Sequence, residues 1–184
     1  MNHPPSKPRI GVQLYSLGPQ FAGDAPGVLR TLAKQGYEGV EFAWEFGGLS
    51  PALLRDLLLY HNHCTELEPL GNATALDQLF ESVDPQRVGA ELDVAYFVQV
   101  GLDPVVYVRR YGNRLPLLHA RDTTADGRSV PVGAGVVDFP AVIEAARDAG
   151  TDWLVVEQNP SSDALQAAGQ SFDALRALIG ETTG

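Results

Sequence analysis

Short β-like runs alternate with helical stretches along most of this chain, and that alternation limits the fold more than any other feature. Runs rich in Val, Ile, Leu and Tyr predict strands at residues 9–17, 39–46, 59–65, 88–94, 115–120 and 153–158. Helical patterns predict helices at 24–36, 51–58, 75–83, from 103 onward, at 139–149, and from 163 onward. Strands that alternate with helices in this way form parallel βα units.

The size of the chain sets how many such units can be present. Its 184 residues fit one domain, and we expect residues 1–184 to form it. A closed barrel of eight βα units usually takes about 250 residues. The pattern gives about six units, so we expect a barrel that is incomplete or is completed by oligomerisation.

One junction in the pattern is abnormal. The helix predicted at 51–58 runs into the strand at 59–65 with no Gly, Pro or Asn between them. A connection from a helix to the next strand usually takes about 2 to 6 residues. We therefore expect that a segment is missing near 58–59.

Composition excludes several classes of function. The formal net charge is −10, with 23 acidic against 13 basic residues, and such a surface repels the phosphates of a nucleic acid. No apolar run is long enough to span a membrane, and the first residues lack the apolar core of a signal peptide, so we expect a cytoplasmic protein. A single Cys64 excludes an internal disulfide.

Polar side chains recur where the predicted strands end. They are Glu41, His61, His63, Asp93, His119, Asp122, Glu157 and Gln158. The carboxyl ends of parallel strands meet at one end of a barrel, where active sites form. Carboxylates are rarely buried unless they are paired or bound to metal, so two carboxylates and two imidazoles here suit Mn²⁺, Zn²⁺ or Mg²⁺.

Each of these residues also has a structural explanation when taken singly. A lone His on a strand is often a hydrogen-bonded core residue. Glu41 suits a structural salt bridge, and Asp122 suits a cap on the loop that follows its strand. Trp44 and Phe46 suit either an apolar wall for a substrate or simple packing.

Seven segments carry a resemblance to a known family. In order they are GVQLYSL, GYEGVEFAW, YHNH, ELDVAYFVQVGLDP, PLLHARD, VGAGVVDFP and WLVVEQ. Together, from about Arg9 to Leu178, they resemble the sugar phosphate isomerase/epimerases, the xylose-isomerase-like TIM barrels. The resemblance implies an α/β, TIM-barrel-like fold whose divalent metal is held by residues from the fifth to eighth strands, here His61, Asp93, His119 and Glu157.

Departures from the family pattern affect the expected chemistry. The third and fourth βα units are absent, and His61 fills a position that is Glu in many relatives. Arg121 and Ala134 stand where relatives commonly show Lys and Glu. The ligands survive these changes, so we expect metal binding with weakened or lost catalysis.

The resemblance implies isomerisation or epimerisation next to a carbonyl, through a metal-stabilised enediolate. Glu157 is then the candidate base and Glu41 a possible substrate contact. His63, Asp122, Arg121 and Trp44 are expected to contact the substrate or to support the ligands.

Three functions stay open. The first is a metal-dependent isomerase or epimerase of a sugar or polyol, or a related lyase of the inosose dehydratase type. The second is a non-catalytic remnant that binds metal or ligand. The third, an abasic-site endonuclease of the same superfamily, is disfavoured by the acidic charge. We also expect a homo-oligomer, most simply a dimer, in which Met1 to about Leu58 exchanges between protomers.

Overall fold

The computed structural model describes residues 7–41, 58–86 and 88–181. The main strands are β1 (Arg9–Gln13), β2 (Gly39–Glu41), β3 (Leu58–His61), β6 (Val88–Asp93), β7 (Leu117–Ala120) and β10 (Trp153–Val156). The helices are α1 (Gly18–Gly23), α2 (Ala25–Gln35), α3 (Ala75–Ser82), α4 (Val94–Gln99), α5 (Pro104–Tyr111), α6 (Phe139–Ala149) and α7 (Ala164–Glu181). Two small hairpins pair β4 (Pro69–Leu70) with β5 (Ala73–Thr74) and β8 (Asp122–Thr123) with β9 (Ser129–Val130).

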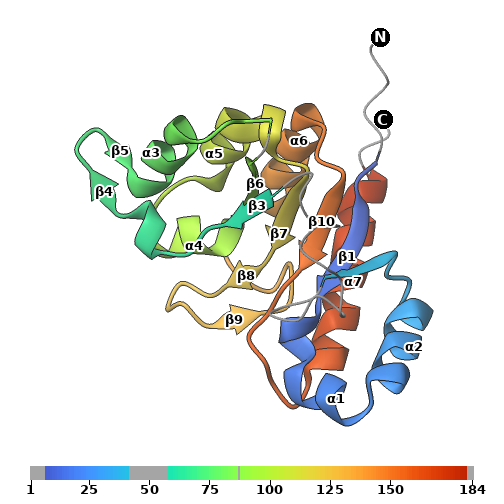
Figure 1. Cartoon of the computed structure of the whole chain (residues 1–184). Coiled ribbons are helices and arrows are strands. Elements are labelled where there is room, and N and C mark those ends of the chain that lie inside the picture. The colour runs from blue at the N-terminus through green and yellow to red at the C-terminus, as the bar shows by residue number, and fades with distance from the viewer. Residues whose placement is uncertain (1–6, 42–57, 87, 182–184) are drawn as a thin grey trace.

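The six main strands form one parallel sheet in the order β2-β1-β10-β7-β6-β3 (Figure 1). The sheet is a half-barrel with β2 at one edge and β3 at the other. This confirms the TIM-barrel-like α/β fold with six units that the sequence predicts. Among the described residues, the helices include none that is long and apolar enough to cross a bilayer.

The outer face of the sheet holds the apolar core. Alternate strand residues point to one side, and on this side they are Ile10, Val12, Ala90, Leu92, Leu118, Ala120, Leu154 and Val156, all buried. The helices form a row along this side, in which α6 packs between α5 and α7, and α7 packs against α2 (Figure 1). Burying apolar surface between the two layers is the main force that holds them together.

The inner face carries the polar residues, and the strand register decides which of them meet. His61 lies opposite Glu91, Asp93 lies opposite His119, and Glu41 lies opposite Gln13. In a parallel sheet, residues opposite one another point to the same face. The register therefore gathers the polar side chains of several strands on one surface.

The helix ends follow local signals that the sequence shows. Asp24 and Asp103 each accept a hydrogen bond from a backbone N–H in the first turn of α2 and α5. Gly36 ends α2 with φ 106°, in the left-handed region that glycine adopts most easily.

Several expected strands are shorter than their apolar runs. The strand expected at 9–17 ends at Gln13, and Leu14–Leu17 is a 3-10 helix; the strand expected at 59–65 ends at His61. Val94 begins α4 instead of ending β6.

Part of the predicted pattern lies outside the described residues. This applies to the end of the second strand with Trp44 and Phe46, and to the helix expected at 51–58 up to residue 57. Leu58 itself belongs to β3, which corrects the expected end of that helix.

Candidate metal centre

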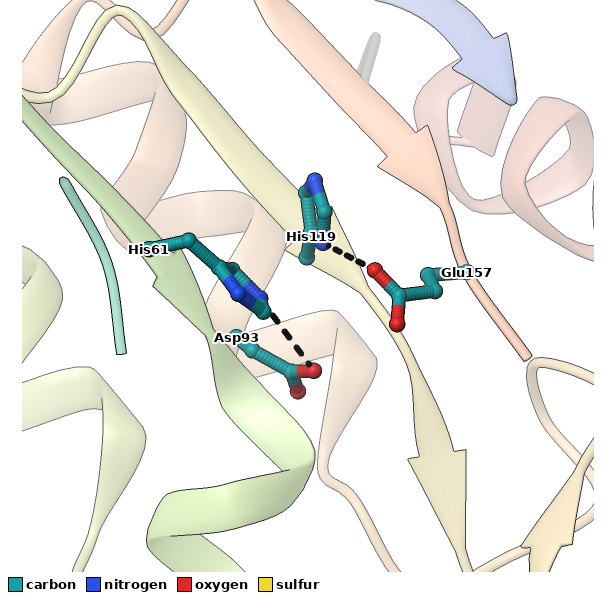
Figure 2. A group of neighbouring side chains, drawn as sticks. All are labelled: His61, Asp93, His119 and Glu157. Atoms are coloured by element: carbon teal, nitrogen blue, oxygen red, sulfur yellow. Dashed lines mark ion pairs between the residues drawn. The ribbon is translucent and has the colours of Figure 1, made fainter. Parts of the chain in front are cut away.

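Four side chains from four adjacent strands meet on the inner face of the sheet (Figure 2). His61 is in β3, Asp93 ends β6, His119 is in β7, and Glu157 follows β10 directly. One ligand atom of each lies within 4.8 Å of those of the other three. Donor atoms that share one metal ion lie roughly 3 to 4 Å apart, so a small closing movement would bring these four into one coordination sphere.

Asp93 has one carboxylate oxygen committed to the backbone and one directed at the cluster. Oδ1 accepts a hydrogen bond of 2.9 Å from the N–H of Ala95 at the start of α4. Oδ2 lies 3.7 Å from Nε2 of His61. The backbone N–H of Asp93 donates to Oδ1 of Asn62, which fixes β6 beside the end of β3. The side chain is fully buried, so Oδ2 needs a cation nearby.

His119 lies between three carboxylates. Nδ1 is 2.7 Å from Oε2 of Glu157, while Nε2 is 2.9 Å from Oε2 of Glu41 and 2.7 Å from Oε1 of Glu91. Burial by itself lowers the pKa of His119, but Glu157, Glu41 and Glu91 outweigh burial and raise the pKa well above its ordinary value. Without a metal the imidazole is therefore the cation that balances these carboxylates.

Glu91 is the member of the site that the sequence prediction missed. It lies inside β6, buried, with its carboxylate on the imidazole of His119. Burial alone would raise the pKa of Glu91, but the hydrogen bond and charge of His119 lower it. The signal that could have found it is its spacing from Asp93, because residues two apart on a strand share a face.

The donor set fits a divalent metal ion. Nε2 of His61 is buried and has no hydrogen bond to any described residue, while Nδ1 of His119 has the Glu157 carboxylate 2.7 Å away. Buried polar atoms without partners are rare in folded proteins. Two imidazole nitrogens and two carboxylate oxygens are ligands that Zn²⁺ and Mn²⁺ accept, and the carboxylates alone suit Mg²⁺. On Nε2, the Glu41 and Glu91 carboxylates can orient a metal-bound His119, as carboxylates commonly do for metal-bound histidines.

Comparison with known proteins places this site in a family context. The family model described as "Xylose isomerase-like TIM barrel" matches residues 55–178. The chain belongs to this family. The match to the xylose isomerase-like family covers all four strands that carry the cluster.

Curated relatives of this xylose isomerase-like chain include inosose dehydratases. The protein of that name from Lacticaseibacillus casei is 26% identical over 136 residues, which is 60% of this chain and 45% of the relative. The one from Clostridium tetani is 27% identical over 125 residues, 56% of this chain and 41% of the relative. The chain thus spans less than half the length of the curated relatives it matches.

Solved structures share the fold. A sugar phosphate isomerase/epimerase from Parabacteroides distasonis superposes with a TM-score of 0.75 at 21% identity, covering 94% of each chain. A D-allulose 3-epimerase from Methylomonas sp. gives a TM-score of 0.56 at 13% identity, covering 94% of this chain and 98% of the other. At these identities the likeness is one of fold.

The remaining predicted site residues are spread around the cluster. Arg121 joins it directly, with Nη1 3.3 Å from Oδ2 of Asp93 and 3.8 Å from Oε1 of Glu157. His63 is half-exposed and lies at its rim, its ring centroid 4.9 Å from that of His61. Gln158 is not drawn into the cluster, since its side chain donates to Ser171.

Asp122 is turned to a neighbouring loop. Its carboxylate accepts hydrogen bonds of 2.8 to 3.2 Å from the backbone N–H groups of Thr123, Gly133, Gly135 and Val137. Both oxygens are therefore used to hold this loop, the structural role that the sequence left open for Asp122.

Proposed function

We propose that this protein binds a divalent metal ion through His61, Asp93, His119 and Glu157, and that it moves a proton next to the carbonyl group of a sugar or polyol. The observation that carries the proposal is the meeting of these four side chains from four adjacent strands, with Nε2 of His61 buried and without a hydrogen-bond partner among the described residues. The family supports it, because relatives are named as sugar epimerases and inosose dehydratases.

A bound divalent ion would stabilise the negative charge that develops on the substrate oxygens as the proton leaves. Two carboxylates flank His119 from opposite ring nitrogens and are candidates for handling that proton. Glu157 is buried beside Nδ1, and Glu41 is more exposed beside Nε2. We assign Glu157 the role of base and Glu41 that of a substrate contact.

Isomerisation or loss of water suits this site better than two-base epimerisation. Epimerisation by two bases needs a carboxylate on each face of the substrate carbon, and the resemblance to the family implies that His61 fills a position that is Glu in many relatives. Elimination of water can use a single carboxylate, which takes the proton next to the carbonyl and then gives it to the departing hydroxyl so that water leaves, and Glu157 could serve in this way while a bound divalent ion would polarise the carbonyl. Of isomerisation and elimination of water, the inosose dehydratase relatives favour elimination.

We expect turnover to be slow. Among the described residues, no strand covers one side of the inner face of the half-barrel, so we expect the substrate to be held on fewer sides. Catalysis depends on fixing the reacting geometry and excluding water. A turnover number below about 1 s⁻¹, the low end of ordinary enzymes, is the expected result.

The test combines metal content with a substrate screen. Metal in the purified protein is measured by mass spectrometry, and small ketoses and inososes are then assayed for isomerisation and for loss of water. Glu157→Gln should abolish any turnover and weaken metal binding, whereas His63→Gln, a half-exposed imidazole at the rim, should retain metal binding.

Each outcome separates the candidate functions. Metal binding without turnover of any substrate would favour a non-catalytic binding protein of the same family. Failure of the wild-type protein to bind Mn²⁺ or Zn²⁺ at millimolar concentration would rule out the metal site itself.

A further inference from the structure

Arg121, which the sequence predicts to contact the substrate or to support the ligands, is held in place by contacts within the protein. Its guanidinium is buried, with Nη2 2.8 Å from Oδ1 of Asn159 and the group 4.7 Å above the ring of Tyr96. Nη1 points to Asp93 and Glu157. A planar guanidinium that is stacked on one face and hydrogen-bonded at its edge loses little freedom on binding a carboxylate.

The oxygen that Arg121 contacts is the same oxygen that Asp93 has available for a metal. Oδ1 of Asp93 is bound to the N–H of Ala95, so only Oδ2 faces the cluster. Nη1 of Arg121 donates to this Oδ2 at 3.3 Å. Any cation bound between His61 and Asp93 must share this oxygen with the guanidinium or displace it.

The charges around Oδ2 of Asp93 also indicate competition between Arg121 and a metal ion. With neutral imidazoles, the four proposed ligands carry two negative charges, which match those of a divalent ion, and the carboxylates of Glu41 and Glu91 lie on Nε2 of His119. Arg121 adds a positive charge within the same buried group. Like charges a few ångströms apart in a poorly solvated site repel strongly, and salt screens buried pairs little.

We propose that Arg121 is a built-in cation that competes with the divalent metal for Asp93, so that Oδ2 of Asp93 has a positive partner when no metal is bound and the protein binds metal more weakly than its ligand set allows. This inference rests on the metal site proposed above. It adds a residue that sets the metal affinity without being a ligand. The buried Nε of Arg121 has no hydrogen-bond partner among the described residues, which is consistent with a guanidinium that takes a second position when metal displaces it from Asp93.

The competing explanation is that Arg121 orients Asp93 for the metal. The two roles predict opposite signs for the change in affinity when the guanidinium is removed. Competition predicts tighter binding in the variant, because the repulsion and the blocked oxygen are both relieved. Orientation predicts weaker binding, because Asp93 would lose its position.

The experiment measures Mn²⁺ and Zn²⁺ affinity against a chelating dye for wild type and Arg121→Gln. The control is Arg128→Gln, which removes the same charge from an exposed ion pair with Asp126. We expect Arg121→Gln to bind about tenfold more tightly, the effect of one partly buried charge, and the control to bind as wild type does. Thermal unfolding in EDTA should show Arg121→Gln melting below wild type, with metal raising its melting temperature by more than it raises that of wild type.

A second variant covers the case in which Arg121→Gln does not fold. Asn159→Ala removes the exposed acceptor that holds Nη2 and leaves all four ligands in place. It should tighten metal binding about two- to threefold by loosening the guanidinium. Unchanged or weaker binding in the folded variants, while wild type binds metal, overturns the competition but leaves the metal site intact; absence of metal binding in every variant overturns both.

Discussion

At the scale of single residues, the feature with the clearest consequence is the position of His119 between three carboxylates. A buried carboxylate needs a positive partner, and in the metal-free protein the imidazolium of His119 serves Glu157, Glu41 and Glu91 together. A metal ion on Nδ1 would have to displace that proton, so metal binding and protonation are linked.

We expect the stability of the metal-free protein to fall as the pH rises above neutrality. The pKa of His119 is raised on folding, so its contribution is complete below the unfolded value of about 6.5 and is lost as the pH rises through the folded pKa. The expected slope reaches up to about 1.4 kcal/mol per pH unit, the value for one proton. Urea unfolding in EDTA at several pH values measures it.

The matched variants for this measurement are His119→Gln and His63→Gln. His119→Gln should lose the pH dependence, while His63→Gln, which changes a half-exposed imidazole, should keep it. A stability that climbs between pH 7 and 9 would show that His119 is not protonated in the folded state.

The proposed ligands could be anticipated from sequence because each follows an apolar run that must be buried. The carboxylates that contact His119 could not be predicted from the sequence. Whether Glu91 reaches it depends on the stagger of β6 against β7, in which Glu91 pairs with Leu117 and Asp93 with His119. Stagger between strands of successive βα units is set by the packing of whole units, and no local pattern encodes it. The contact of Arg121 with Asp93 also depends on the stagger of the strands, so it could not be predicted from the sequence either.

At the scale of elements, the start of α3 concentrates several interactions on one carboxylate. Asp77 accepts from the backbone N–H and the hydroxyl of Thr74, closing a capping box, and also pairs with Arg110 and Tyr111 of α5. Burial alone would raise the pKa of Asp77, but these hydrogen bonds, led by Tyr111, lower it to about 2.

Asp77→Ala should lower the free energy of unfolding at pH 7 by about 2 kcal/mol, since it removes a cap and leaves Tyr111 without its acceptor. The contribution of Asp77 is present above its unfolded pKa of about 3.9 and is lost as the pH falls toward 2. Asp173→Asn, which alters an exposed pair with Arg176, should change stability by less than about 0.5 kcal/mol. Equal effects of the two substitutions in urea unfolding at pH 7 and pH 3 would contradict this assignment.

Helices proved easier to locate from sequence than the ends of strands. The predicted starts near Asp24, Asp103 and Phe139 are confirmed because a capping side chain fixes a helix start locally. The helix α4 was missed because Val94, Tyr96 and Phe97 have side chains typical of strands. The burial of Val94 and Phe97 and the cap from Asp93 outweigh that preference.

At the scale of the whole molecule, the half-barrel has two open edges. Each of β2 and β3 pairs with a neighbour on one side among the described strands. Unpaired parallel edges are sites where another chain can add. In the single chain β1 pairs with β10 of the same chain, and the exchange of residues 1–58 between protomers stays a prediction.

We expect a homodimer at micromolar concentration, measured by light scattering. Val40→Lys places a charge on the half-exposed strand β2 and should shift the equilibrium toward monomer, whereas Val106→Lys on α5, at a similarly exposed apolar position, should not. A wild-type protein that stays a 19.7 kDa monomer would rule out the dimer.

The strand order described above also bears on how the chain acquires its fold. The strands that carry the cluster pair with partners at modest separations along the chain, whereas Arg9 of β1 must find Trp153 of β10. Contacts between distant segments form slowly, because the intervening loop must be closed first. During synthesis, β1 and β2 leave the ribosome long before β10 exists, so until then β1 has only β2 of its two neighbouring strands to pair with. The half that carries the His61, Asp93, His119 and Glu157 cluster can therefore assemble as a unit, with the N-terminal strands docking onto it last.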